Sequence, residues 1–380
     1  MPGQILILTE AGDIHAYAVA EALKRKGAEA LVWHTADFPS RSTESLLVEA
    51  NRLTTAIEGN GFRFGEEDHP RVVWRRRPAH WVDPSRLHPA DVAFAEAECL
   101  AFRRSALSVF AQDAFWVNLP DAANRCSRKI LQHRVALDLG LSMPDTLYSN
   151  SPDGILAFIE RHGGRAVYKS FRNSAWRNQN NAWVPFTSEI TEQTLVKADL
   201  LQMVPGIYQE LVPKAFELRI TLMGHQAFAA KIFSQETASG RLDWRKSYHE
   251  LRMEPYETPE AIESLCIAMM ERLGIVFGCF DFIVSPDGNH VFLEVNEMGQ
   301  FLFVEHYTGL PLLDAFTDFL IAGTPDFRWA KKESAVAYRD CLPNAEALAT
   351  EQAEIHLSGP ESFSWEGDSG GPTTWLRPND

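Results

Sequence analysis

The first 34 residues show a strand–helix–strand pattern of apolar positions. Residues 4–9 form a short apolar run that ends at a polar turn, which is typical of a buried parallel strand. A helical spacing of apolar residues follows over about 14–26, Gly27 supplies a C-cap, and a second apolar run covers 28–34. This order predicts a parallel α/β unit. No GxGxxG turn follows the first run, so the pattern does not indicate a dinucleotide site.

The next hundred residues carry a weaker pattern. Residues 36–70 are polar and rich in turn formers. The elements expected over this part are short strands at 62–65 and 71–75, a helix over 90–111, a short strand at 115–117 and a strong helix over about 122–139. A domain boundary is expected near the end of the last helix, because Gly140 and Pro144 stop it there.

Strands dominate the chain from residue 165 onward. They are expected at 165–170, 182–186, 207–211, 216–223 and 226–233. A polar segment then leads to a helix over 259–273 and to two apolar strands, 275–284 and 291–295. The turn 286–289 (PDGN) between these strands predicts an antiparallel hairpin. A last amphipathic helix covers about 311–322.

Beyond residue 330 the apolar periodicity fades. Residues 331–380 hold nine acidic and four basic side chains, a net charge of −5, and are rich in Gly, Pro, Ser and Glu. This composition predicts a largely flexible tail. The whole chain carries 36 basic and 51 acidic side chains, a net charge of −15. Such a chain has no global field that would attract nucleic acid or an anionic membrane, although a local basic cleft remains compatible with it.

Targeting signals and cysteine chemistry are not indicated. The amino terminus has no basic region before its apolar run, and no stretch approaches the roughly 20 apolar residues of a membrane span. The five cysteines form no CxxC pair. A reducing cytoplasm, with cysteines acting as small apolar residues, is therefore expected.

The hairpin near residue 285 carries the most informative polar residues. Glu294 and Asn296 are two positions apart and point to the same face of their strand, and the short turn brings Asp281 of the preceding strand opposite them. All three stand among apolar neighbours, where an unpaired carboxylate is costly. Two carboxylates and an amide oxygen suit Mg²⁺ that bridges nucleotide phosphates. Outward-facing polar residues would be the alternative, but Asp, Glu and Asn are poor strand formers.

Two further groups of residues suit a nucleotide. Glu210 and Glu217 are seven positions apart and flank a strand-to-turn segment, which can pair with adenine through its backbone and offer a carboxylate to ribose. Lys169 lies in a predicted strand and Lys129 in a predicted helix. Each lysine alone is more typical of a surface charge than of a ligand, so only its context gives it weight.

The order of these residues resembles that of the ATP-grasp superfamily: a helix lysine, a strand lysine, a Glu–Glu hinge, and then Asp followed by Glu-x-Asn. The closer resemblance is to the ATP-grasp ligases of ribosomal peptide maturation, the graspetide or microviridin-type macrocyclising ligases. It spans about residues 4–322 and rests on the stretches 74–78 (WRRRP), 117–120 (VNLP), 278–282 (GCFDF) and 293–305 (LEVNEMGQFLFVE).

The resemblance implies an α/β (α+β) ATP-grasp fold in three parts. These are an N-terminal parallel α/β domain over 1–120, a central subdomain over 121–206 and a C-terminal subdomain with the metal site over 207–328. The acidic tail over 329–380 would follow them. ATP would be clamped between the central and C-terminal subdomains.

The resemblance also implies a role for each site residue. Lys129, Lys169 and Lys231 would approach the ATP phosphates. Glu210, with Leu211 beside it, would meet adenine, and Glu217 would hold the ribose hydroxyls. Mg²⁺ would be held by Asp281, Glu294 and Asn296. Arg219 would stabilise the transferring phosphoryl group or acyl phosphate, and Gly299 would offer a backbone amide near the tetrahedral centre. The family's glycines in the loop after Lys169 are replaced here by 170–177 (SFRNSAWR).

Such an enzyme activates a carboxylate as an acyl phosphate, so it needs no side-chain nucleophile. In a graspetide ligase the carboxylate belongs to Asp or Glu of a precursor peptide, and a Thr, Ser or Lys side chain of the same peptide attacks it. Peptide binding is expected in the polar segment 234–256, through Arg241, Asp243, Trp244 and Arg245; a solvated surface hairpin fits this segment equally well. The run Arg75-Arg76-Arg77 is more typical of a solvated strand edge or an interface than of a site.

Two other functions remain open at this point. One is an ATP-grasp ligase that joins free amino acids or adds glutamate to a protein tail. The other is a nucleotide-binding regulatory protein without turnover, against which the complete set of Asp281, Glu294 and Asn296 argues. A homodimer is an expectation by analogy with the family.

Overall fold

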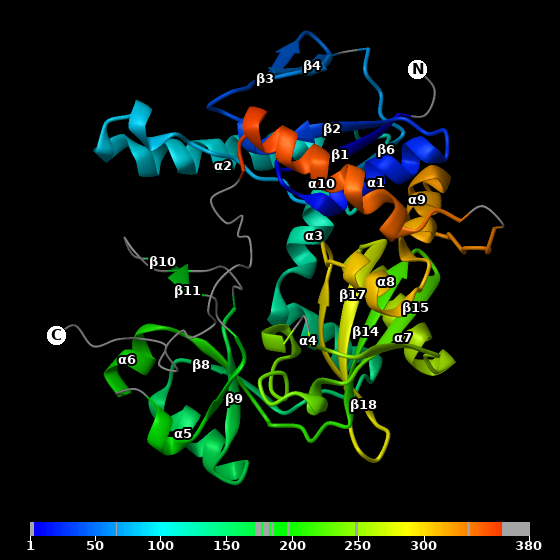
Figure 1. The fold of residues 1–380 in the computed structure, drawn as a ribbon. Coiled ribbons are helices and arrows are strands. Elements are labelled where there is room, and N and C mark those ends of the chain that lie inside the picture. Colours follow the sequence, from blue (N-terminus) through cyan, green and yellow to red (C-terminus); the bar gives the residue numbers. More distant parts are fainter. Residues whose placement is uncertain are drawn as a thin grey trace.

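The computed structural model describes residues 4–65, 67–171, 176–177, 182–183, 186–195, 198–247, 250–332 and 335–358. Figure 1 shows a parallel sheet with its helices at one end of the molecule and two antiparallel sheets below it. This mixed α/β arrangement confirms the predicted fold class. None of the described helices has both the length and the apolar character needed to cross a membrane.

The N-terminal sheet is parallel and has the strand order β2-β1-β6-β7. It comprises β1 (Ile5–Thr9), β2 (Ala30–His34), β6 (Val72–Arg75) and β7 (Phe115–Val117), and α1 (Ile14–Arg25) joins the first two. The first four residues of β1 are apolar because both faces of the sheet are covered: Ile5 and Ile7 pack with α1, while Leu6 and Leu8 pack around Trp33. The predicted strand–helix–strand unit is thus confirmed.

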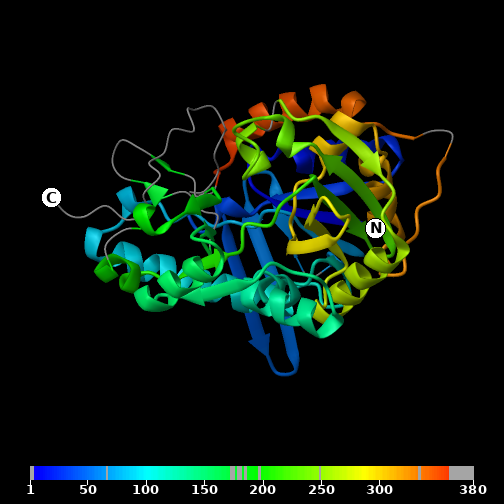
Figure 2. The ribbon, with the colours of Figure 1, turned by 90° about the horizontal axis from the view of Figure 1, so that it is seen from below.

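A second small sheet is built from β3 (Thr43–Glu49), β4 (Arg52–Gly59) and β5 (Phe62–Phe64). The prediction for residues 36–70 missed its first two strands, because only Ile57 among their apolar residues is buried. The β3–β4 hairpin extends away from the rest of the molecule (Figure 2). The predicted helix over 90–111 is present as α2 (Val92–Val109).

The central sheet is antiparallel, with the order β12-β9-β13-β8. It consists of β8 (Thr146–Ser149), β9 (Ala166–Lys169), β12 (Ser188–Ile190) and β13 (Gly206–Gln209). The helices α5 (Pro152–Arg161) and α6 (Ala198–Met203) pack on it around Ile155, Phe158 and Tyr208. Two short strands, β10 (Trp176–Arg177) and β11 (Ala182–Trp183), pair with each other.

The C-terminal sheet has the order β16-β15-β14-β17-β18 and is also antiparallel. Its strands are β14 (Phe216–Met223), β15 (Gln226–Ile232), β16 (Met253–Tyr256), β17 (Phe277–Val284) and β18 (His290–Asn296), and α7 (Glu260–Leu273) covers one face. The predicted hairpin is β17–β18. The segment before β16 contains the 3₁₀ turns Ser234–Glu236 and Trp244–Ser247.

The predicted helix over 122–139 is two helices, α3 (Pro120–Cys126) and α4 (Lys129–Leu139). Helix α4 packs against α7 and β18, so it lies with the C-terminal sheet, although the boundary expected at residue 121 places it in the central subdomain. Helices α8 (Leu302–Thr308) and α9 (Leu312–Ala322) follow β18. Phe316 of α9 contacts Trp74 of β6 and Phe277 of β17, so the N-terminal and C-terminal sheets share one core.

The prediction of a flexible tail is wrong for residues 338–355, which form helix α10 (Tyr338–Ile355). In Figure 1 α10 lies along α1. Three small buried residues at four-residue spacing, Cys341, Ala345 and Ala349, allow this close packing. The acidic composition concealed this narrow apolar stripe. The tail beyond residue 358 lies outside the described residues.

Candidate functional site

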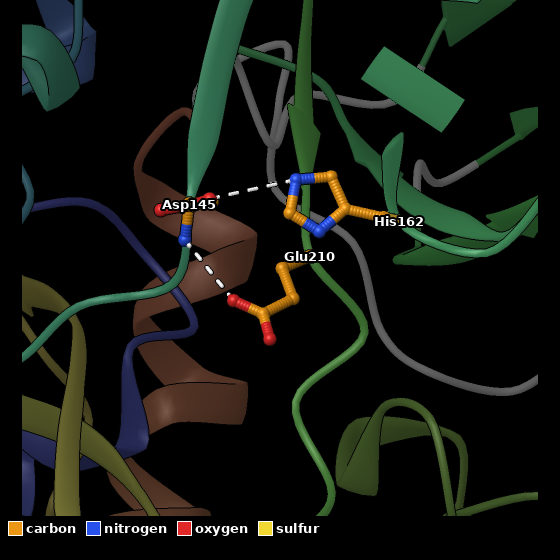
Figure 3. Close-up of side chains that lie close together, drawn as sticks. All are labelled: Asp145, His162 and Glu210. Atoms are coloured by element: carbon orange, nitrogen blue, oxygen red, sulfur yellow. Dashed lines mark hydrogen bonds and ion pairs between the residues drawn. The ribbon is translucent and has the colours of Figure 1, made fainter. Parts of the chain in front are cut away.

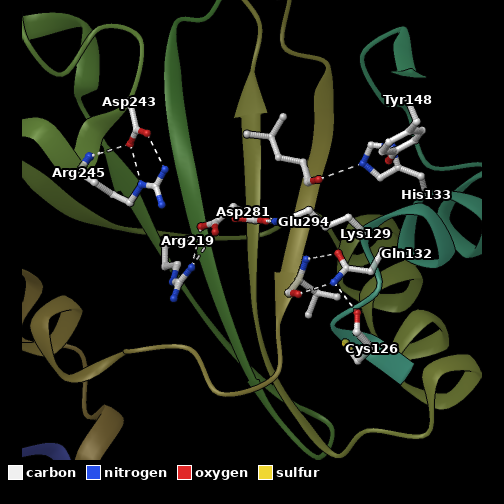
Figure 4. A network of polar contacts seen from close by, with 12 residues as sticks. Cys126, Lys129, Gln132, His133, Tyr148, Arg219, Asp243, Arg245, Asp281 and Glu294 are labelled. Carbon is white, nitrogen blue, oxygen red and sulfur yellow. Dashed lines mark hydrogen bonds and ion pairs between the residues drawn. The ribbon is translucent and has the colours of Figure 1, made fainter. Parts of the chain in front are cut away.

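A cavity of about 570 Å³ lies between the central and C-terminal sheets. Its walls come from α4, β9, the connection between β13 and β14, the strands β14, β17 and β18, and the segment around Asp243. The cavity is lined by most of the residues selected from the sequence: Lys129, Lys169, Glu210, Leu211, Glu217, Arg219, Asp243, Trp244, Arg245, Asp281, Glu294 and Asn296. Figure 4 shows several of them converging on the β17–β18 hairpin.

The hairpin register brings the three predicted metal ligands together. Asp281 pairs with Glu294 across the two strands, and Asn296 pairs with Cys279 two positions further along. Residues paired across antiparallel strands point to the same face, so Asp281, Glu294 and Asn296 all face the cavity. An irregularity between Asp281 and Phe282 shifts the register only beyond this point.

Asp281 is held by Arg219 on the neighbouring strand. Arg219 Nη1 donates to both carboxylate oxygens of Asp281, at 2.9 and 2.7 Å, and Nη2 donates to the carbonyl of Gln300 at 2.9 Å. Burial raises the pKa of Asp281, the Arg219 charge opposes that shift, and Glu294 adds to it. Any additional cation in the cavity would therefore stabilise the charged form of the Asp281 carboxylate.

Glu294 is surrounded by positive charge. Its carboxylate pairs with Lys129 Nζ, and the Lys129 charge is the main reason that the Glu294 pKa falls to about 2, with Lys169 and Arg245 contributing. Burial lowers the pKa of Lys169, while Glu294 supports its charged form. Asp281 and Glu294 are therefore accompanied in the cavity by four cationic side chains that act on them, as a magnesium–polyphosphate ligand requires: Lys129, Lys169, Arg219 and Arg245.

The connection between β13 and β14 contributes Glu210 and Leu211 to the cavity, and β14 contributes Glu217, as expected. The connection also contributes Lys214, which was not among the predicted site residues. Lys214 Nζ donates to Glu217 Oε1 at 2.8 Å and to the carbonyl of Leu242 at 3.2 Å. Burial raises the pKa of Glu217, and Lys214 opposes this shift. The position of Lys214 three residues before Glu217 could have indicated their ion pair from the sequence. The contact of Lys214 with Leu242 could not be foreseen, because Leu242 is distant in the sequence.

The segment around Asp243 closes another side of the cavity. Asp243 is buried and accepts two hydrogen bonds from the Arg245 guanidinium, at 2.8 and 2.6 Å, and one from the Thr187 amide at 3.1 Å. Burial alone would raise the Asp243 pKa, but these hydrogen bonds and the Arg245 charge lower it to about 2. Arg245 is thereby held with its charge toward Glu294 and Asp281.

No protein-family model and no curated protein matches the chain. Among solved structures it is similar to a ligase of Chryseobacterium gregarium, described as an ATP-grasp ligase associated with ribosomally synthesised and post-translationally modified peptides (RiPPs) and solved with ADP and a leader and core peptide. The identity is 26%, the TM-score is 0.76, and the match covers 86% of this chain and 100% of that one. The chain is an ATP-grasp ligase.

The ligase is also similar to two macrocyclases of Microcystis aeruginosa MRC. MdnC, bound with precursor peptide MdnA, has 27% identity and a TM-score of 0.73, with 84% of this chain and 100% of that chain covered. MdnB has 28% identity and a TM-score of 0.67, with 84% and 99% covered. The predicted resemblance to ATP-grasp ligases of ribosomal peptide maturation is confirmed by these matches.

Two residues predicted for the site of this ligase, Lys231 and Arg241, lie elsewhere. Lys231 pairs with Leu218 across β14 and β15, so it points to the sheet face opposite Arg219, and its Nζ lies 4.2 Å from the ring centre of Phe216. Because successive side chains of a strand alternate between the two faces of a sheet, Lys231 and Arg219 lie on different faces, and Lys231 does not face the cavity. Arg241 is exposed and does not line the cavity.

Gly299 stands next to the cavity but in a different role from the one expected. Its amide donates to the carbonyl of Asn296 at 3.3 Å and is therefore already engaged. A Cβ at this position would lie 2.8 Å from Arg219 Nη2 and 2.6 Å from Cys279 Cβ. Gly299 thus makes room for the Arg219 guanidinium.

Two buried amide side chains that the sequence analysis missed hold the hairpin in place. Gln132 of α4 bonds both the amide and the carbonyl of Val295, at 2.9 and 2.8 Å. Asn118 bonds the amide and carbonyl of Phe277, at 3.1 and 2.9 Å, the Val276 amide at 2.7 Å and the Glu297 carbonyl at 2.9 Å. These contacts join residues 158 to 179 positions apart, so local sequence patterns carry no signal for them.

The run Arg75-Arg76-Arg77 was expected at a solvated strand edge or an interface, and its first two residues are not solvated. Arg76 is 2% exposed, pairs with buried Asp13 at 3.2 Å and donates to the carbonyl of Met298 at 2.8 Å. Arg75 contacts the Met298 sulfur. Both arginines therefore support the loop that follows β18. Four residues of the glycine-free loop after Lys169, 172–175, lie outside the described residues.

Proposed function

We propose that this ATP-grasp ligase forms side-chain ester or amide crosslinks in a ribosomally made precursor peptide. A carboxylate oxygen of the peptide attacks the γ-phosphorus of ATP, which gives an acyl phosphate and releases ADP. A Ser or Thr hydroxyl or a Lys amine of the same peptide then attacks the acyl carbon, loses its proton and expels phosphate. The peptide loses the elements of one water for each ring.

The observation that carries this proposal is the arrangement of charges in one cavity. Asp281 and Glu294 face each other beside Lys129, Lys169 and Arg219. The ion pair of Arg245 with buried Asp243 forms another wall. The proteins most informative for comparison were solved with ADP and with precursor peptides.

We assign the nucleotide to the side of the cavity formed by the β13–β14 connection. Glu210 and Leu211 meet adenine there, and Glu217, held by Lys214, receives the ribose hydroxyls. Lys129 and Lys169 reach the phosphates. Asp281, Glu294 and Asn296 would hold Mg²⁺, which neutralises phosphate charge. Arg219, fixed by Asp281 and Gln300, is oriented toward the transferring group.

We assign the peptide carboxylate to the side formed by Asp243, Trp244 and Arg245. A guanidinium matches a carboxylate or an acyl phosphate in shape and charge. Because Asp243 holds Arg245 through two hydrogen bonds, little conformational freedom is lost when the peptide binds.

The test is mass spectrometry of candidate precursor peptides, encoded near the ligase gene, after incubation with ATP and Mg²⁺. Loss of about 18 Da per ring, with release of ADP, is the expected result. Turnover with free amino acids alone, or addition of mass to a peptide, would instead favour amino-acid or glutamate ligation. No ADP release with any substrate would favour the regulatory protein without turnover.

The metal assignment is tested by Asp281→Asn and Glu294→Gln. Both variants are expected to lose ATP-dependent activity, because an amide lacks the charge needed to hold Mg²⁺. Asp287→Asn, which changes an exposed aspartate in the turn of the same hairpin, is the matched control and should remain active. Full activity of Asp281→Asn and Glu294→Gln would overturn the metal assignment.

We also propose that the ligase is a cytoplasmic homodimer. The β3–β4 hairpin exposes 52% of Leu47 and 74% of Val48, and α2 exposes 69% of Phe94, which suits burial against a second copy. Free cysteines and a need for ATP suit the cytoplasm. Light scattering of the wild type and of Val48→Asp tests the dimer; a monomeric wild type would refute it.

A further inference from the structure

Three potential metal ligands meet beside the adenine end of the cavity, outside the Asp281 site. Asp145 precedes β8, His162 follows α5, and Glu210 follows β13. Figure 3 shows the His162 ring and the Asp145 carboxylate facing each other, with the Glu210 carboxylate approaching the Asp145 backbone. One ligand atom of each residue lies within 4.8 Å of the others, and no other such group of three occurs within the residues that the structure describes.

The imidazole in this group has an unused nitrogen. His162 Nε2 is shielded from solvent and has no hydrogen-bond partner among the described residues. Its nearest carboxylate oxygen, Oδ2 of Asp145, is 3.6 Å away, which is longer than a hydrogen bond. A buried ring nitrogen without a partner is costly, and a metal ion would satisfy it.

The two carboxylates make only long contacts and can complete the site. Glu210 Oε2 accepts a long bond of 3.4 Å from the Asp145 amide. The Asp145 side chain is 67% exposed, so it can rotate toward a shared ion at little cost. Zinc binds nitrogen and carboxylate oxygen at about 2.0–2.2 Å, so a small contraction of the group brings all three ligands into range.

We propose that Asp145, His162 and Glu210 bind one divalent transition-metal ion of the zinc class. An imidazole ligand selects against Mg²⁺, which prefers oxygen donors alone, and so separates this site chemically from Asp281, Glu294 and Asn296. The ion would tie the start of β8 and the end of α5 to Glu210, at the beginning of the connection that we assign to adenine. The metal-binding claim itself does not depend on the proposed peptide substrate.

The test is a titration of the full chain with Zn²⁺ in competition with a chromogenic chelator, in excess Mg²⁺ so that sites with oxygen donors alone are filled. We expect one Zn²⁺ per chain. His162→Ala and Asp145→Asn should each weaken its binding about 10- to 100-fold or more, since even indirect support of a ligand is worth that much. His306→Ala, which removes an exposed histidine elsewhere, is the control and should bind as the wild type does.

If His162→Ala fails to fold, Asp145→Asn still tests the proposal, because a change to an exposed side chain should leave the fold intact. Replacement of Zn²⁺ by Co²⁺ gives a second readout: the absorption spectrum should lack a thiolate-to-metal band, because the site contains no cysteine. Absence of zinc binding, or wild-type zinc affinity in both His162→Ala and Asp145→Asn, would overturn the proposal. A cobalt–thiolate band would overturn it as well.

Discussion

Gly299 offers the sharpest test of how the site is built. A Cβ there would lie 2.6 Å from Cys279 Cβ, 2.7 Å from Cys279 Sγ and 2.8 Å from Arg219 Nη2. Ordinary contacts between such atoms begin near 3.5 Å, so Gly299→Ala creates an overlap of about 1 Å. Overpacking of this kind costs about 1–3 kcal/mol of unfolding free energy.

The same overlap should also lower the catalytic rate, because it displaces the Arg219 guanidinium. Its guanidinium bonds both oxygens of Asp281 and the carbonyl of Gln300. A displacement of about 1 Å therefore misplaces the charge that faces the transferring group, which can reduce the rate on the order of 100-fold. Had Gly299 acted only through its backbone amide, alanine would be harmless, since it keeps that amide.

Urea unfolding and ADP release, measured on the same preparation, check both effects. Gly65→Ala is the matched control: the nearest atom to its added Cβ would be 4.0 Å away, so stability and rate should not change. Adding Cys279→Gly to Gly299→Ala removes two of the three clashes and should restore part of the ADP release. Wild-type stability and rate in Gly299→Ala would refute the steric argument.

Three further predictions follow from the buried polar groups. Lys129→Met removes the main cause of the low Glu294 pKa of about 2, so that burial raises this pKa. The acidic limb of the pH profile of ADP release should therefore move toward neutral pH. An unmoved limb would contradict the assignment. Burial lowers the pKa of His15 to about 3 and that of His34 to about 4, below about 6.5 in the unfolded chain. As the pH falls, the unfolded state therefore binds protons before the folded state does, and each ring should cost about 1.4 kcal/mol of unfolding free energy per pH unit below 6.5. The difference in unfolding free energy between pH 7 and pH 5, measured with urea, should be smaller for His34→Gln than for the wild type. Equal differences would argue against this effect of His34. Asn118→Ala leaves four backbone groups without their partner and should cost about 2–4 kcal/mol in urea unfolding, whereas exposed Asn60→Ala should cost little; similar losses in both would speak against the bridging role.

Much of the fold was predictable because its strands and helices bury regular faces. The apolar run of β1, the β17–β18 hairpin and most of the strands between them were expected from periodicity alone. Helix α10 was not, because three small residues form its buried face within an acidic segment. The β3–β4 hairpin was missed for a related reason, since most of its apolar side chains remain exposed.

For the site, the sequence alone determined the residues that local geometry brings together. Strand alternation and a short turn are sufficient to place Asp281, Glu294 and Asn296 on one face, and the order of the motifs pointed to ATP-grasp ligases. Only the tertiary structure decided which distant groups join them. It turned Lys231 to the opposite face, engaged the Gly299 amide, and brought Lys214, Asn118 and Gln132 to partners far away in the chain. The physical reason is that register and packing between sheets depend on contacts across the whole chain, which no local pattern encodes.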